Sequence, residues 1–222
     1  MKLEDTSLTP AEIIMSVNNK SKVQELIKFT FYDLLLRNLI GVNQMETETS
    51  GDDFFIQSFS SKKGNIKDHE EIFIKIISKE EGLISFKKLV FELSNYGNEK
   101  FRSIMPEFIF EKIVLRSLVR SELFVIEKKV SFLIFRRREV VPTEKGSKII
   151  NAIRSVKNDY PANWLFIANR NFKQNSDFFE SKLFLELDEN FNRHFWDGIK
   201  NRHVALAYWG RGNYPKPQID RG

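Results

Sequence analysis

The stretch that decides the fold expected for this chain is LFVIEKKVSFLIFRRREVV, residues 123–141. It contains two runs of apolar, β-branched and aromatic residues on either side of Glu127, Lys128 and Lys129. Two such runs joined by a short polar break are typical of a β-hairpin, because side chains of these types favour the pleated conformation. We therefore predict a β-hairpin over about residues 123–142, with its turn at the three charged residues.

A long helix is predicted directly before this hairpin. Pro106 begins the segment PEFIFEKIVLRSLVRSEL, and proline is favoured at the first position of a helix because the N–H it lacks has no helical partner there. A second helix, SKIINAIRSV, is predicted after the hairpin, beyond Pro142. A helix followed by a β-hairpin is how a winged-helix unit ends, so the sequence predicts one such unit over about residues 82–157.

The first part of the chain predicts a similar unit over about residues 8–65. Thr9 and Glu12 have the spacing of a capping box at the start of a short helix. The next segment, KVQELIKFTFYDLLLRNLI, has apolar residues at intervals of three and four, which is typical of an amphipathic helix, and Gly41 is expected to end it. Polar residues 43–52 then predict a turn before a short aromatic strand, DFFIQSFS.

The two units resemble one another. In each, a helix with an arginine near its last turn leads through an apolar exit and a polar turn to an aromatic strand: FYDLLLRNLIGV precedes DFFIQSF, and KIVLRSLVRSELF precedes VSFLIF. Such an echo predicts a structural repeat. We therefore expect a mainly α fold with short β-hairpins, an α+β protein whose helix–hairpin units resemble tandem winged helices in one compact domain.

The remaining segments predict further helices around these two units. One is expected at about residues 68–78, another follows Gly82, and C-terminal helices are expected over about 160–205. Together they are expected to form a single domain over residues 1–205. The last residues, 206–222, contain several Gly and Pro and are expected to form an extended tail.

The composition limits the class of protein. Of 222 residues, 41% are hydrophobic and 29% charged, a mixture that supports a packed core; phenylalanine is unusually common, with 21 residues. The absence of cysteine excludes disulfides, thiol catalysis and thiolate metal sites. No signal peptide and no apolar run of about 20 residues is present, so we expect a cytoplasmic protein, in solution or peripheral to a membrane.

Residues that could carry catalysis are few. Of the three histidines, His69, His194 and His203, the last two are nine positions apart, which does not place two imidazoles on one helix face. Glu189, His194 and Asp197 could meet around one helical turn and hold a metal, and a hydrolase built on His194, Asp197 and His203 is the enzymatic alternative. No phosphate-binding glycine loop and no nucleophile elbow is present. We expect a non-enzymatic protein without cofactor or metal.

Basic residues gather in and around the predicted hairpin. The chain has a formal net charge of +5 and a pI near 9.2, which permits an anionic partner. On a winged-helix interpretation the cations would straddle a nucleic-acid backbone; on a lipid interpretation they would meet anionic headgroups while a phenylalanine enters the interface. A third interpretation is a solvated hairpin whose charges prevent edge-to-edge aggregation.

The order of these motifs resembles the Golgi phosphoprotein 3 family. Members open with a leucine- and threonine-led helix and continue with a helix that has a leucine–arginine exit, here LTPAEIIMSV and FYDLLLRNLIGV. A long helix, a hydrophobic hairpin and a further helix follow, here with LFVIEKKVSFLIFRRREVVPTEKG and SKIINAIRSV. The resemblance covers roughly residues 8–157. It implies a single-domain, mainly helical, peripheral membrane protein that binds phosphoinositides and uses its hairpin for membrane contact or self-association.

The family's lipid-binding positions transfer only in part. The tryptophan position falls near Asn18, and the arginine of the second helix falls near Ile27, next to Lys28. The arginines of the long helix fall on either side of Lys112. What the resemblance implies for this chain is therefore a basic surface that meets anionic lipid without the full phosphate-clamping set.

These observations give one expected site and two expected functions. The leading hypothesis is a binding or scaffold protein that contacts an anionic membrane surface or a protein partner, with homo-oligomers forming through the hairpin; the alternative is a tandem winged-helix protein that binds nucleic acid. The expected cations are Lys28, Lys112, Arg116, Arg120, Lys128, Lys129, Arg136, Arg137 and Arg138. The expected hydrophobic contacts of the hairpin are Phe124, Phe132 and Phe135.

Overall fold

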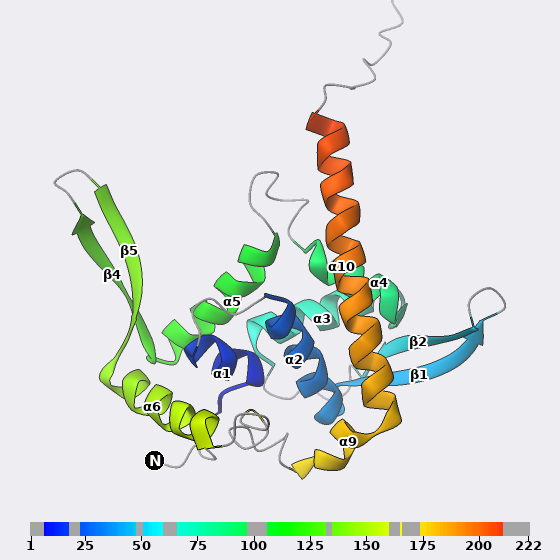
Figure 1. Ribbon diagram of the computed structural model, residues 1–222, viewed down its shortest axis with the longest axis horizontal. Helices are drawn as coiled ribbons and strands as arrows, with labels where there is room; N and C mark the ends of the chain where they lie inside the picture. The colour runs from blue at the N-terminus through cyan, green and yellow to red at the C-terminus, as the bar shows by residue number, and fades with distance from the viewer. Residues whose placement is uncertain are drawn as a thin grey trace, which may run out of the picture.

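The fold is mainly helical, with two antiparallel β-hairpins on opposite sides of the body (Figure 1), which confirms the expected class. The computed structural model describes residues 7–17, 23–47, 51–59, 66–96, 106–131, 135–159, 165 and 174–210. The elements, in chain order, are α1 Pro10–Val17, α2 Val23–Leu36, β1 Ile40–Thr47, β2 Gly51–Ser58, α3 Asp68–Lys79, β3 Leu83–Ser85, α4 Phe86–Ser94, α5 Pro106–Arg120, β4 Phe124–Ser131, β5 Phe135–Pro142, α6 Glu144–Asp159, α9 Ser176–Glu180 and α10 Lys182–Gly210.

The first sheet has three antiparallel strands in the order β1-β2-β3. Strand β1 occupies half of the region that the sequence predicts as a polar turn, and β3 precedes α4 where only a helix is expected. Both differences have the same cause: β1 is polar along much of its length and β3 has three residues, so neither produces a hydrophobic alternation that sequence inspection detects. Pairing with β2, which holds the buried Phe54 and Ile56, makes them strands.

The expected role of Gly41 at the end of the second helix is wrong. Helix α2 ends at Leu36, and Asn38 takes the left-handed conformation that ends it, with φ 54°. Gly41 lies within β1, where the ring of Phe59 covers it; a Cβ there would lie 2.7 Å from the ring's Cζ. The glycine is therefore explained by close packing, and Asn provides the helix stop because its short polar side chain tolerates positive φ.

The expected structural repeat is present, and it extends to individual backbone bonds. After α2, the N–H of Leu39 donates to the carbonyl of Leu34 at 2.9 Å; after α5, the N–H of Leu123 donates to Leu118 at 3.1 Å. After the second strand of each hairpin, the chain returns to the residue that precedes the first strand. The N–H of Phe59 donates to the carbonyl of Leu39, and the N–H of Thr143 donates to the carbonyl of Leu123, both at 3.0 Å. Each hairpin has two strands of eight residues.

The second hairpin is confirmed, but its turn lies later than predicted. Strand β4 runs to Ser131 and β5 begins at Phe135, so Lys128 and Lys129 lie within β4 and the three arginines 136–138 lie within β5. The error arose because charged residues were assigned to a turn. A hairpin that projects from the body has solvent beside it, so charged residues are tolerated within its strands.

The sheet of the second unit has two strands, whereas that of the first unit has three, because β3 pairs with β2. In the first unit, the backbone N–H of Ser58 donates to the carbonyl of Gly82 beside β3 at 3.2 Å. Pro142 occupies the corresponding position of β5, opposite Phe124 as Ser58 is opposite Ile40. Proline has no N–H to donate, and proline on an edge strand is a known device against further strand pairing.

The core lies where the two units meet. Helix α1 is buried along its whole length except at Val17, between α2, α5 and α6. Aromatic rings of α2, α4 and α10 fill the other side, where Phe86 contacts both Phe31 and Phe191 at ring-centroid distances of 5.1 and 6.2 Å. The richness in phenylalanine thus serves packing between helices.

The C-terminal region is one long helix where several shorter segments are expected. Helix α10 is continuous to Gly210, so the predicted tail beginning at residue 206 starts inside it, and residues 211–222 lie outside the described part of the chain. Gly198 lies inside this helix, where the absence of a side chain allows close packing against α4. A Cβ there would lie 2.4 Å from Oγ of Ser94. Beyond this contact the helix projects from the body (Figure 1).

Candidate functional site

Helix α5 has one buried face and one basic face. Val114 and Leu118 are fully buried against α1, α2 and α3, while Lys112, Arg116 and Arg120 are exposed, four positions apart. Residues spaced by four lie along one side of a helix. The structure therefore places these three cations on one side of α5.

One of these three cations is already paired. Nη1 of Arg120 lies 2.5 Å from Oδ2 of Asp68, at the start of α3, although Arg120 remains 67% exposed. Exposed pairs of this kind contribute about 0–1 kcal/mol and exchange easily with other anions. Lys112 and Arg116 are the exposed cations of α5 for which the structure shows no ion pair among the described residues.

The β4–β5 hairpin, which follows α5 in the chain, contains five further basic residues. Its register places Lys128 opposite Arg138, Lys129 opposite Arg137, and Val130 opposite Arg136. Like charges directly opposite each other destabilise a strand pair. Positions 128–131 and 135–138 are described by their backbone, so the structure gives the register of these cations but not their side-chain contacts.

The expected hydrophobic contacts of the hairpin are only partly placed. Phe124 is 3% exposed and belongs to the core, so its assignment to a contact surface is wrong; it packs inward because β4 leaves the body at this residue. Phe132 lies outside the described residues, and Phe135 is described by its backbone alone. Among the side chains of the hairpin that the structure describes, Val125 and Ile126 are exposed apolar ones, at 42% and 54% exposure.

Lys28 does not join the basic surface. Its Nζ lies 2.9 Å from Oδ1 of Asp188 on α10, and the side chain is 16% exposed. The same carboxylate oxygen accepts a hydrogen bond from the hydroxyl of Tyr32 at 3.0 Å, and burial together with this carboxylate raises the pKa of Tyr32. Lys28 thus attaches α2 to α10, and its charge is neutralised.

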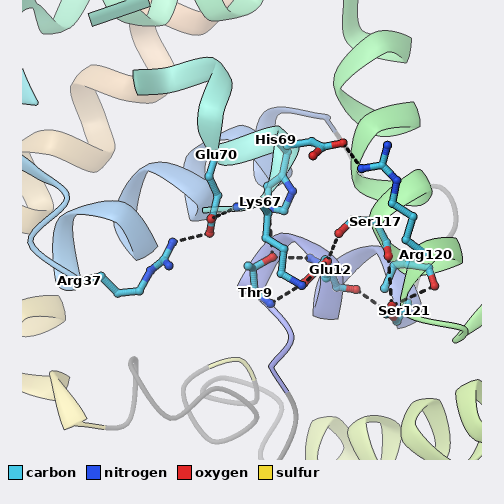
Figure 2. A network of polar contacts seen from close by, with 12 residues as sticks. Thr9, Glu12, Arg37, Lys67, His69, Glu70, Ser117, Arg120 and Ser121 are labelled. Atoms are coloured by element: carbon cyan, nitrogen blue, oxygen red, sulfur yellow. Dashed lines mark hydrogen bonds and ion pairs between the residues drawn. The ribbon is translucent and has the colours of Figure 1, made fainter. Parts of the chain in front are cut away.

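A buried polar cluster joins both units beneath the basic face of α5 (Figure 2). Glu12 on α1 is fully buried and accepts hydrogen bonds from the backbone N–H of Thr9 at 2.8 Å and from Oγ of Ser117 on α5 at 2.5 Å. Nζ of Lys67 lies 3.5 Å from the carboxylate. The predicted capping box is therefore present, since Oγ1 of Thr9 also accepts from the N–H of Glu12 at 3.3 Å.

His69 and Glu70 extend this cluster along the first turn of α3. Nε2 of His69 lies 3.1 Å from Oγ1 of Thr9, and its Nδ1 is buried with no hydrogen-bond partner among the described residues. Burial lowers the pKa of His69 to about 4, although the nearby carboxylate of Glu12 opposes the shift. Burial raises the pKa of Glu70 to about 7, against the opposing effect of Arg37.

Arg37 connects the cluster to the end of α2. Its Nη2 donates to Oε1 of Glu70, and its Nε lies 2.9 Å from Oδ2 of Asp33, an ion-pair distance without hydrogen-bond geometry. Glu70 also accepts the backbone N–H of Lys67 at 2.7 Å. The cluster is enclosed by packed helices and has the character of a structural joint between α1, α2, α3 and α5.

A surface hollow of about 540 Å³ lies at the start of α6, lined by Glu122, Thr143, Glu144, Lys145 and Lys148. Both lysines are engaged: Lys145 donates to the carbonyl of Ser121 at 3.3 Å, and Lys148 pairs with Glu144 at 2.7 Å. The hollow lies at the base of the β4–β5 hairpin. Lys145 contacts the corner between α5 and β4 through Ser121, whereas the Lys148–Glu144 pair lies within α6.

The expected metal alternatives find no support in the described residues. Within the described part of the chain, no three histidine, aspartate or glutamate side chains gather closely enough to hold a metal ion. The ring of His194 meets Phe86 edge-on at 6.4 Å, as a packing residue does, and the side chain of His203 lies outside the description. None of the described helices has the length and apolar character needed to cross a membrane.

Comparison with known proteins provides no family assignment. No protein-family model matches the chain, and no curated protein matches it significantly. The resemblance to the Golgi phosphoprotein 3 family therefore remains a prediction from the order of motifs.

Sequence reasoning missed the buried cluster almost completely. It identified Thr9 and Glu12 as a local cap but did not predict that Ser117, Lys67 and His69 converge on them. The available signal was a carboxylate inside an otherwise apolar helix, because such a group needs buried partners.

Proposed function

We propose that the protein is a non-enzymatic binding protein that contacts an anionic membrane surface through the β4–β5 hairpin and the basic face of α5. The register of β4 and β5, which places cation opposite cation in two successive pairs, is the observation that carries the proposal. A pair of strands with this register gains stability when anions lie beside it, since the repulsion between neighbours is then screened.

The position of the hairpin supports a contact role. Figure 1 shows β4 and β5 extending away from the helices, and at their base the N–H of Thr143 donates to the carbonyl of Leu123. Exposed Val125 and Ile126 lie on the same strand as the cations. Basic residues next to exposed apolar ones are what binding at a charged lipid interface requires, because headgroup attraction and shallow apolar insertion act together.

The chemistry expected of this surface is attraction without a defined phosphate pocket. Each basic residue near an anionic leaflet contributes about 1 kcal/mol, and the attraction falls off within a Debye length of about 8–10 Å. Lys112 and Arg116 add to the hairpin cations, whereas Lys28 does not, because it is paired with Asp188. The proposal is therefore binding that depends on surface charge more than on headgroup identity.

Vesicle co-sedimentation tests the proposal. Wild-type protein is expected to sediment with phosphatidylserine-containing vesicles and not with phosphatidylcholine vesicles, and to be released by salt. Arg136→Glu/Arg137→Glu is expected to lose most of this binding. Lys75→Glu/Lys87→Glu, which changes net charge equally at exposed positions of α3 and α4, is the matched control and is expected to retain it. Equal binding to both vesicle types, or equal loss in both variants, overturns the proposal.

A second candidate, binding to duplex nucleic acid, is favoured by one observation. Helix α5 exposes its three cations directly before a projecting hairpin, the order of a recognition helix and wing, although β3 pairs with β2 instead of joining that hairpin. This candidate requires affinity for a DNA duplex that falls steeply as salt rises. Fluorescence anisotropy with a labelled duplex at low salt measures it, and absence of binding there eliminates it.

A further inference from the structure

The two hairpins of the internal repeat carry opposite charge. Strands β1 and β2 contain Glu46, Asp52 and Asp53 and no lysine or arginine. Strands β4 and β5 contain five basic residues and the two acidic residues Glu127 and Glu139. The structure thus has one acidic and one basic copy of the same element.

The opposite charges occupy corresponding positions. Ile40 pairs with Ser58 as Phe124 pairs with Pro142, and this alignment brings Asp52 into correspondence with Arg136, and Asp53 with Arg137. Within each hairpin, the strand register places residues of like charge opposite each other: Glu46 lies opposite Asp52, and Lys129 lies opposite Arg137. Neither hairpin balances these charges within its own cross-strand pairs.

One molecule does not bring its two hairpins together. They lie on opposite sides of the helical body, β1–β2 on the right and β4–β5 on the left of Figure 1. Two molecules do so readily, because strands of eight residues on each side give hairpins of equal length, about 27 Å at a rise of about 3.3–3.4 Å per residue. An acidic hairpin of one copy therefore matches a basic hairpin of another in length and in sign.

Exposed apolar side chains are present on both elements. Met45 on β1 is 42% exposed and lies opposite Asp53, while Val125 and Ile126 on β4 are 42% and 54% exposed. Burial of such groups gives a contact an apolar component besides its electrostatic one. Because Pro142 removes the donor that Ser58 uses to bind a third strand, the contact does not extend the sheet along that edge of β5.

We infer that the basic hairpin also binds a second copy of this chain, which docks through its acidic β1–β2 hairpin. The contact joins two different surfaces, so it is heterologous, and it leaves one hairpin of each kind free at the two ends of the assembly. Such an assembly grows with concentration as an open chain or closes as a ring. The inference does not rest on membrane binding, because it is tested without lipid.

The test is sedimentation velocity of the full chain, without vesicles, over a range of protein and salt concentrations. Wild type is expected to form species larger than the monomer at low salt and to dissociate as salt rises. Arg136→Asp/Arg137→Asp and Asp52→Arg/Asp53→Arg are each expected to be monomeric alone and to associate when mixed, since each then supplies the charge that the other lacks. Lys75→Glu/Lys87→Glu is expected to behave as wild type.

A charge-swapped chain carrying all four substitutions restores complementarity at unchanged net charge and is expected to associate. If a charge-reversal variant loses its circular dichroism spectrum, the neutral variants Asp52→Asn/Asp53→Asn and Arg136→Gln/Arg137→Gln replace it, with weaker association expected from each. A monomeric wild type at every concentration overturns the inference, as does association that both reversals leave unchanged, or a mixture that stays monomeric. Failure here leaves the vesicle experiment standing.

Discussion

The hydroxyl of Ser117 donates a hydrogen bond to Oε1 of Glu12 at 2.5 Å, across a sequence distance that spans the whole first unit. Glu12 lies on α1 and Ser117 on α5, the helix that carries the basic face. The bond therefore fixes the helix that presents the candidate site to the N-terminal helix in the core. Opening this joint removes support from α5 without touching any exposed cation.

Glu12→Gln is expected to destabilise the protein by about 3 kcal/mol. The amide places an NH₂ group among three donors, the N–H of Thr9, the hydroxyl of Ser117 and the ammonium of Lys67, so at least one buried donor loses its acceptor. Urea unfolding followed by circular dichroism measures the loss. Ser155→Ala, on the exposed side of α6, is the control, with a change within about 0.5 kcal/mol. Equal stability of the two variants would show that the cluster contributes nothing.

His69→Gln is expected to change how stability depends on pH. The folded-state pKa of His69, about 4, lies below its ordinary value of 6.5, so its contribution to stability is complete above pH 6.5 and is lost as pH falls toward 4. Gln preserves a polar group near Thr9 but does not titrate. The stability difference between wild type and variant is therefore expected to move in favour of the variant by up to about 3 kcal/mol between pH 6.5 and pH 4.

Glu70 has the opposite dependence and partly masks that of His69 in the wild type. Its folded-state pKa of about 7 lies above its ordinary value of 4.5, so its contribution is complete below pH 4.5 and is lost as pH rises through 7. Glu12, Lys67, Asp68 and Arg37 surround His69 and remain in both proteins. Urea unfolding at several pH values measures the stability of wild type and His69→Gln, with His194→Gln as control. If the stabilities of wild type and His69→Gln change in parallel with pH, the prediction is contradicted.

Gly146→Ala is expected to cost about 3 kcal/mol or more, and Gly41→Ala less. A Cβ at Gly146 would lie 1.9 Å from the carbonyl oxygen of Leu123, which is itself bonded to Thr143 and cannot move without opening the second hairpin's base. At Gly41 the obstacle is the ring of Phe59, which is 37% exposed and free to swing outward. Thermal unfolding of both variants measures the difference, and a larger loss at Gly41 would contradict it.

The parts of the fold with strong local patterns could be predicted from the sequence. The amphipathic spacing of α2, the capping residues Thr9 and Glu12, and the repeated helix–hairpin order all act over short stretches, so they are visible without tertiary information. The exposed spacing of Lys112, Arg116 and Arg120 follows from helical periodicity in the same way. These features indicate the class of fold and the shared side of the three α5 cations.

The parts that depend on distant partners could not be predicted. The polar strand β1 exists because β2 binds it, and the burial of Phe124 depends on where β4 leaves the body. Lys28 is an ordinary surface cation in the sequence, and only the folded chain shows it beside Asp188. Long-range pairing of this kind leaves no periodic signal, so the expected site included one phenylalanine and one lysine that belong elsewhere.

Lys28→Met is expected to leave binding to anionic vesicles unchanged, whereas Lys112→Met is expected to weaken it. Both changes remove one positive charge, but Lys28 is neutralised by Asp188 and 16% exposed, while Lys112 is exposed on the basic face of α5. A free cation contributes about 1 kcal/mol at an anionic surface, roughly a fivefold change in the partition coefficient, and a paired one contributes little. Co-sedimentation of both variants at one salt concentration gives the comparison. Equal loss in both would mean that net charge alone governs binding, and that the surface formed by α5 and the hairpin has no special part in it.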